Sequence, residues 1–233
     1  MHGRVTQAQL VHAPDGSRHT VLTPSVGQAQ AAVLVIQEMW GVTEHLLTFA
    51  ESLAGHGYLA VVPHLYPEPD DPATDPARAK ALVRGLNGAV IEPAVRAGID
   101  LARQSGAARI GIVGFCMGGT VALWAAARAP VDAAVTFYGG GLGAPRWPGI
   151  PAGLELAAGL RAPWLGLYGE QDRSIPMSEV RRLGEVLADS TVPTDVVSYP
   201  GAGHAFAGTG AGRVEAAAAD GWARAVTWFE AHL

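Results

Sequence analysis

A lone cysteine lies inside a glycine-rich segment of the sequence. Cys116 stands in residues 114–119 (GFCMGG), between an apolar run, Arg109–Val113, that predicts a strand and a segment, Met117–Arg128, that predicts a helix. The pattern G-x-C-x-G is typical of a sharp strand-to-helix turn that presents a nucleophile, because side chains at the flanking positions would collide. A helix N-terminus also favours thiolate over thiol. The alternative is a buried structural cysteine beside glycines that help a helix pack on a strand.

Two further residues follow predicted strands later in the chain. Asp172 comes after Trp164–Tyr168, and His204 comes after Asp195–Tyr199. His204 would accept and return protons, while Asp172 would hold its imidazole in one tautomer. Taken singly, the aspartate could be a turn former and the histidine an ordinary loop residue. The chain order nucleophile, acid, histidine is the one that α/β-hydrolases use, so we expect a catalytic triad with Cys116.

The elements that must position these residues alternate along the chain. The predicted strands are Arg4–Val11, His19–Thr23, Ala31–Gln37, Tyr58–Val62, Arg109–Val113, Ala133–Tyr138, Trp164–Tyr168 and Asp195–Tyr199. The predicted helices are Thr43–His56, Ala77–Leu86, Glu92–Ser105, Met117–Arg128, Ser178–Asp189 and Val214–His232. The alternation predicts one α/β domain over residues 1–233, with a mostly parallel sheet, helices on both faces and an N-terminal antiparallel hairpin. Leu65–Asp75 and Gly139–Gly153 predict loops, the first of them on the surface.

Composition excludes several classes of function. Apolar residues make up 49% of the chain and charged residues 16%, which is typical of a globular protein. The net charge is −5 and no Lys/Arg block occurs, so nucleic acid is not an expected partner. No apolar run is long enough to span a membrane, and a cytoplasmic location is expected. A single cysteine excludes an internal disulfide, and we expect neither a metal nor another cofactor.

Four segments together resemble the dienelactone hydrolase family, the carboxymethylenebutenolidases. They are residues 37–41 (QEMWG), 114–119 (GFCMGG), 169–172 (GEQD) and 201–206 (GAGHAF). The resemblance covers nearly the whole chain and implies an α/β-hydrolase fold and a monomer. It also implies an esterase or lactonase that opens an enol lactone or activated ester through a Cys-His-Asp triad and a thioester acyl-enzyme. Because a thiolate is easily expelled from a tetrahedral intermediate, such a nucleophile suits small-molecule esters with good leaving groups.

The same resemblance assigns further residues. Glu38 would help to generate the Cys116 thiolate when substrate binds, since burial would raise the pKa of its carboxyl. The alternative is a loop glutamate paired with a surface arginine. The backbone N–H groups of Met117 and Met39 would form the oxyanion hole. The side chains that could contact substrate are Trp40, Arg78, Tyr138 and Phe206, and the three aromatic ones could equally be core residues.

One position departs from the family pattern. Members that open dienelactones hold the substrate carboxylate with arginines, and one of these lies four residues after the catalytic histidine, where this chain has Gly208. This departure favours a carboxylesterase or thioesterase of the same fold acting on a neutral substrate, unless a nearby arginine such as Arg146, Arg173 or Arg213 compensates. A thiol redox sensor or a non-catalytic binding protein is a further alternative, but neither needs an acid and a histidine in hydrolase order.

Overall fold

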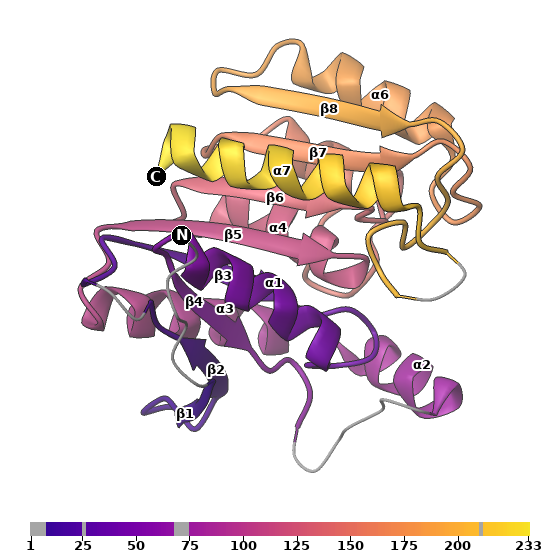
Figure 1. The fold of residues 1–233 in the computed structure, drawn as a ribbon. Helices are drawn as coiled ribbons and strands as arrows, with labels where there is room; N and C mark the ends of the chain where they lie inside the picture. The colour runs from indigo at the N-terminus through magenta and orange to yellow at the C-terminus, as the bar shows by residue number, and fades with distance from the viewer. Residues whose placement is uncertain (1–7, 25–26, 68–74, 210–211) are drawn as a thin grey trace.

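In this computed structural model, residues 8–24, 27–67, 75–209 and 212–233 are described. Within them, eight strands form one sheet in the order β1-β2-β4-β3-β5-β6-β7-β8 (Figure 1). The strands are β1 Gln9–His12, β2 Arg18–Leu22, β3 Ala31–Ile36, β4 Leu59–Pro63, β5 Arg109–Phe115, β6 Ala133–Phe137, β7 Trp164–Gly169 and β8 Thr194–Tyr199. In this order, β1 pairs antiparallel with β2, and β2 pairs antiparallel with β4. All the pairs from β4 across the sheet to β8 are parallel.

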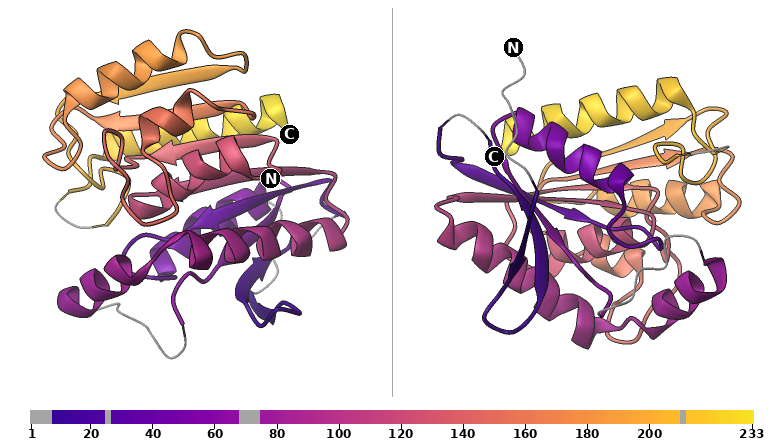
Figure 2. Two further views of the ribbon diagram at one scale, coloured as in Figure 1. Left: turned by 180° about the vertical axis from the view of Figure 1, so that it is seen from behind. Right: turned by 60° about the horizontal axis from the view of Figure 1, so that its bottom comes forward.

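Helices cover both faces of this sheet. They are α1 Glu44–Gly55, α2 Pro76–Gly85, α3 Gly88–Gln104, α4 Met117–Arg128, α5 Gly153–Ala157, α6 Met177–Leu187 and α7 Glu215–His232. Helices α1 and α7 lie on one face, and α3, α4 and α6 lie on the other, as the opposite views show (Figures 1 and 2). Strands β3 and β4 are buried along their whole length, which explains their uninterrupted apolar sequences. The expected mostly parallel sheet with an antiparallel hairpin is confirmed.

The arrangement of the strands determines where polar residues can gather. Strands β3, β5, β6, β7 and β8 run in the same direction, so the loops after them meet at one edge of the sheet. Strand β5 lies between β3 and β6. Any residue that ends β5 is therefore flanked by the loops that leave β3 and β6, which is the usual place for an active site in such a sheet.

The structure corrects one prediction and adds one element. The segment Leu65–Asp75 was expected to form a surface loop, but Leu65 and Tyr66 are only 2% and 5% exposed. Both residues are bonded to the segment that follows β3, Leu65 to the side chain of Gln37 and Tyr66 to the carbonyl oxygen of Met39. Residues 68–74 of that segment, and Arg4 to Gln7 of the first predicted strand, lie outside the described residues. The short helix α5 begins inside the predicted loop Gly139–Gly153. None of the described helices is long and apolar enough to cross a membrane.

Candidate active site

Cys116 occupies the sharp turn between β5 and α4. Its backbone has φ 54° and ψ −114°, a left-handed conformation that costs energy for any residue other than glycine. The neighbouring glycines are required by close contacts between backbones. A Cβ atom on Gly114 would overlap the carbonyl group of Gly118, and one on Gly118 would lie 2.5 Å from the carbonyl oxygen of Ile36 at the end of β3. The turn therefore forms only with glycine at these positions, and it presents Cys116 at the edge where the strands end.

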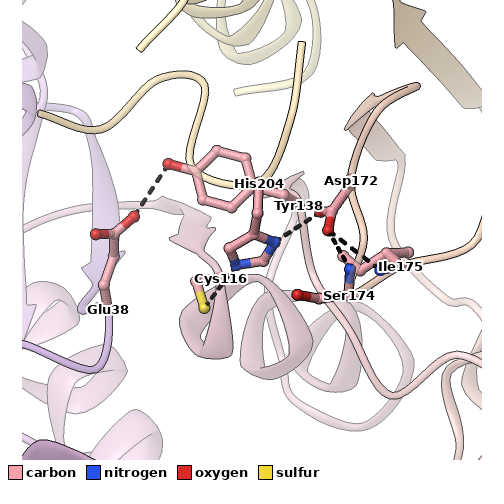
Figure 3. Close-up of polar contacts among 7 residues, drawn as sticks. All are labelled: Glu38, Cys116, Tyr138, Asp172, Ser174, Ile175 and His204. Atoms are coloured by element: carbon pink, nitrogen blue, oxygen red, sulfur yellow. Dashed lines mark hydrogen bonds and ion pairs between the residues drawn. The ribbon is translucent and has the colours of Figure 1, made fainter. Parts of the chain in front are cut away.

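His204 and Asp172 complete a continuous chain of contacts with this cysteine (Figure 3). His204 Nε2 lies 3.1 Å from Cys116 Sγ, and His204 Nδ1 lies 2.6 Å from Asp172 Oδ2. The other carboxylate oxygen, Asp172 Oδ1, accepts the backbone N–H groups of Ser174 at 2.7 Å and Ile175 at 3.2 Å. The aspartate side chain is only 1% exposed. Its orientation is therefore fixed from both sides.

The imidazole of His204 can carry a proton near neutral pH. Burial lowers its pKa, but hydrogen bonds to Asp172 and Cys116, together with their negative charges, outweigh burial and raise the pKa to about 10. The sulfur of Cys116 thus lies against a group that can take up or release a proton. The geometry places a thiol, an imidazole in contact with it and a carboxylate that orients the imidazole in one row, which is the arrangement that nucleophilic catalysis needs.

Glu38 lies near the contacts between Cys116, His204 and Asp172, but its own hydrogen bond is to Tyr138. Its Oε1 atom accepts a hydrogen bond of 3.0 Å from the hydroxyl of Tyr138, and in Figure 3 the carboxylate points toward Tyr138 while Cys116 points toward His204. Burial raises the pKa of Glu38, although the Tyr138 hydrogen bond and the nearby His45 and His204 partly oppose this rise. The partner of the Glu38 carboxylate is thus a tyrosine, and not the surface arginine that the sequence offered as an alternative.

The two expected oxyanion donors lie on either side of a buried tyrosine. Met117 is the first residue of α4, where backbone N–H groups have no carbonyl partner within the helix. Met39 lies in the tight turn that follows β3. The Tyr66 hydroxyl donates to the carbonyl oxygen of Met39 at 3.1 Å and lies 3.3 Å from Met117 Sδ. Sequence reasoning missed Tyr66, and the only signal was its position just after the apolar strand β4.

The residues expected to contact substrate take different positions. Trp40 is partly exposed in the turn after β3. Arg78 is exposed on α2 and lines a cavity of about 410 Å³ with the loop after β4. Tyr138 and Phe206 have no exposed surface, and their rings pack edge to face at 5.2 Å. The structure therefore places Phe206 in the core behind Tyr138.

An arginine lies against the position where the sequence departs from the family pattern. Gly208 is buried, and its carbonyl oxygen accepts Nη1 of Arg213 at 3.2 Å. Arg213 also forms a two-pronged ion pair with Glu215, at 2.7 and 3.1 Å. Its guanidinium is thus already paired in this structure. Arg146, by contrast, stacks on the ring of Trp147, 5.0 Å from its centroid. Among the described residues, no group of three or more His, Cys, Asp or Glu side chains could hold a metal ion.

Comparisons with family models, curated proteins and solved structures all match this chain to the same group of proteins. The model of the "Dienelactone hydrolase family" matches residues 19–233. A "Putative carboxymethylenebutenolidase" of Salmonella typhimurium is 37% identical over 249 residues, covering 94% of this chain and 90% of that protein. A "Carboxymethylenebutenolidase" of Rhodococcus opacus is 33% identical over 215 residues, covering 86% and 81%. The crystal structure of a "Putative Dienelactone Hydrolase" from Klebsiella pneumoniae matches with a TM-score of 0.87 and 33% identity, covering 97% and 99%.

Proposed function

Because this chain belongs to the dienelactone hydrolase family, whose members hydrolyse esters and lactones, we propose that it opens its substrate with a Cys116–His204–Asp172 triad. The chain has the α/β-hydrolase fold of that family. The observation that carries the proposal is the unbroken series of contacts from the Cys116 sulfur through His204 to Asp172, at 3.1 and 2.6 Å. All three residues follow strands of one sheet, which supports a site built within a single domain.

The first half of the proposed reaction acylates the cysteine. His204 takes the thiol proton, and the sulfur of Cys116 attacks the carbonyl carbon of the ester or lactone. The carbonyl oxygen becomes an oxyanion that the N–H groups of Met117 and Met39 stabilise. When the tetrahedral intermediate collapses, the C–O bond breaks, and His204 returns its proton to the leaving oxygen. A thioester acyl-enzyme remains, and for a lactone the leaving oxygen stays on the same molecule.

The second half restores the enzyme. His204 removes a proton from a water molecule, and the resulting hydroxide adds to the thioester carbonyl carbon. The C–S bond then breaks, and the departing thiolate takes the proton back from His204, which releases the free acid and restores the thiol. In both halves Asp172 keeps the imidazole in the tautomer whose Nε2 faces the reacting atoms. We propose that Glu38 acts on Cys116 only after its bond to Tyr138 is broken, since it is held by that hydroxyl at rest.

The substrate of this site is either an anionic enol lactone or a neutral activated ester or thioester. The second candidate is supported by a specific observation. Gly208 offers no side chain, and the arginine that reaches its carbonyl, Arg213, is already paired with Glu215. A guanidinium in such a pair is less available for a substrate carboxylate. The redox-sensor alternative gains no support, because a sensor has no use for a histidine oriented by a carboxylate.

Hydrolysis of cis-dienelactone and p-nitrophenyl acetate by wild type and Cys116→Ala tests the proposal. Ser105→Ala, a change at the far end of α3, serves as a control for handling and folding. Turnover of the dienelactone by wild type alone would support the lactonase form. Cleavage of only the activated ester, again by wild type alone, would support the neutral-substrate form. Activity on neither substrate, or equal activity in Cys116→Ala, would refute the nucleophile.

A further inference from the structure

The segment after β4 is bonded to both neighbours of Glu38. The backbone N–H of Leu65 donates to Gln37 Oε1 at 3.0 Å, and the next residue, Tyr66, donates through its hydroxyl to the carbonyl oxygen of Met39 at 3.1 Å. These two hydrogen bonds tie the loop after β4 to the turn after β3. Gln37 is 1% exposed and Tyr66 5%, so water cannot readily replace either partner. The turn that carries Glu38 is therefore held on both sides.

The Tyr66 hydroxyl contacts both residues that the proposed reaction uses as oxyanion donors. Besides the carbonyl oxygen of Met39, it lies 3.3 Å from the sulfur of Met117. The turn after β3 has one internal hydrogen bond, from Gly41 N–H to the carbonyl oxygen of Glu38 at 3.1 Å, and Tyr66 is the partner that the structure gives to the Met39 carbonyl. One hydroxyl thus links the turn after β3 to the start of α4.

We infer that Tyr66 is a positioning residue for the oxyanion hole: its hydroxyl fixes the Met39 backbone relative to the first turn of α4. This inference rests on the proposed function. Oxyanion donors lower a barrier only when they are already aimed at the place where charge develops, because reorientation during the reaction would cost what the hydrogen bonds gain. The two donors lie on separate elements, the turn after β3 and the first turn of α4, and a buried tyrosine that contacts a residue of each gives them a common anchor.

The hydroxyl remains a donor under assay conditions. Burial is the main cause that raises the pKa of Tyr66 above its ordinary value of 10, and the nearby Cys116 raises it further, whereas Gln37 and Arg146 oppose this. The proton therefore stays on the oxygen throughout the pH range in which an ester hydrolase is assayed. Loss of the hydroxyl, and not its titration, is the change that tests its role.

The test compares two reactions of Cys116 in Tyr66→Phe. Acylation by p-nitrophenyl acetate, followed as the burst of p-nitrophenol, passes through an oxyanion. Alkylation by iodoacetamide displaces iodide from a saturated carbon and forms no oxyanion, so it reports only the reactivity of the thiolate. We expect Tyr66→Phe to slow acylation about tenfold, less than outright loss of a donor, with little change in KM and an unchanged alkylation rate.

Tyr168→Phe is the matched control. Tyr168 is 1% exposed, and its hydroxyl has no hydrogen-bond partner among the described residues, so its removal should change neither rate. Gln37→Met, which removes the bond to Leu65, is a second variant for which we expect the same selective loss of acylation. It also keeps the inference testable should Tyr66→Phe not fold.

Two outcomes would overturn the inference alone. One is acylation of Tyr66→Phe at the wild-type rate. The other is an equal fall in acylation and alkylation, which would mean that Tyr66 acts on the thiolate or on the fold as a whole. If the wild-type protein itself is not acylated while iodoacetamide still alkylates Cys116, the proposed function is refuted, and the inference falls with it.

Discussion

The hydroxyl of Tyr138 and the carboxylate of Glu38 form a 3.0 Å hydrogen bond across the end of β5. Glu38 follows β3 and Tyr138 follows β6, and the strand between them carries Cys116. Tyr138 has φ 40° and no exposed surface, and its ring also packs edge to face against His204 at 5.2 Å. The strained backbone of Tyr138 thus directs its hydroxyl at the carboxylate of Glu38. The bond holds the Glu38 carboxylate to Tyr138, while the sulfur of Cys116 contacts His204.

Glu38→Gln should stabilise the protein more at neutral pH than at acid pH. Burial raises the pKa of Glu38 in the folded state above its ordinary value of 4.5, so the folded state binds the proton more tightly than the unfolded state does. The carboxyl group therefore reduces stability as the pH rises from below 4.5 through the folded-state pKa, whereas glutamine does not titrate. Melting temperatures of wild type and variant at about pH 4 and about pH 7.5 measure the difference.

Glu215→Gln is the control for that experiment and should behave in the opposite way. Glu215 pairs with Arg213, which lowers the pKa of its carboxyl, so its contribution to stability is present at neutral pH and lost toward acid pH. Because this pair is exposed, the effect should be small. Equal melting-temperature differences at both pH values for Glu38→Gln would contradict a raised pKa at that position.

Asp172→Asn should abolish most of the activity without unfolding the protein. The asparagine oxygen can still accept the N–H groups of Ser174 and Ile175, but its amide nitrogen would then face His204 Nδ1 as a donor. The imidazole would be driven to the tautomer that places its proton on Nε2, toward the sulfur. We expect kcat to fall roughly 10³–10⁴-fold. Asp100→Asn, on the exposed face of α3, is the control, and a loss below about tenfold in Asp172→Asn would argue against its orienting role.

The sequence was sufficient to predict the residues that occupy strand ends, and insufficient for the contacts between loops. Cys116, Asp172 and His204 each follow a β-type segment, and parallel strands bring such positions to one edge whatever their exact order. Tyr66 was missed because its contact with Met39 depends on β4 being the neighbour of β3, which alternation of strands and helices does not determine. The loop that contains it is rich in proline and aspartate beyond Pro67, and this composition concealed the buried start of the segment.

The sequence was also insufficient to predict which polar side chains pair and which aromatic side chains are buried. The bond between Glu38 and Tyr138 depends on β3 and β6 flanking β5, a feature of strand order and not of any local motif. Phe206 follows His204 by two residues, and nothing in that spacing distinguishes a pocket wall from the core position that it takes. Nor does the sequence indicate that Arg213 reaches back to the carbonyl of Gly208.

The stability that His204 contributes should decline between about pH 6.5 and about pH 10. Its pKa is raised from 6.5 in the unfolded chain to about 10 in the fold, so its contribution is complete below the lower value and is lost as the pH rises through the upper one. The melting-temperature difference between wild type and His204→Asn should therefore shrink across that range. Since Asp172 is one cause of the raised pKa, Asp172→Asn should itself show a weaker pH dependence than wild type. A difference that is constant with pH would refute a proton-binding role for this histidine.

Gly118→Ala should destabilise the protein and disable the nucleophile, although it adds a single methyl group. That methyl would lie 2.5 Å from the carbonyl oxygen of Ile36 and 2.7 Å from that of Gln37, which are backbone atoms that cannot move unless the turn carrying Glu38 also moves. We expect a loss of about 1–3 kcal/mol or more in the free energy of unfolding, measured by urea denaturation, and a weakened acylation burst.

Gly184→Ala is the matched control, because Gly184 lies in α6 with no atom within 4 Å of an added Cβ. There the alanine should stabilise the helix by about 0.5–1 kcal/mol and leave the burst unchanged. Wild-type stability in Gly118→Ala would mean that the turn around Cys116 is less tightly packed against β3 than the structure requires.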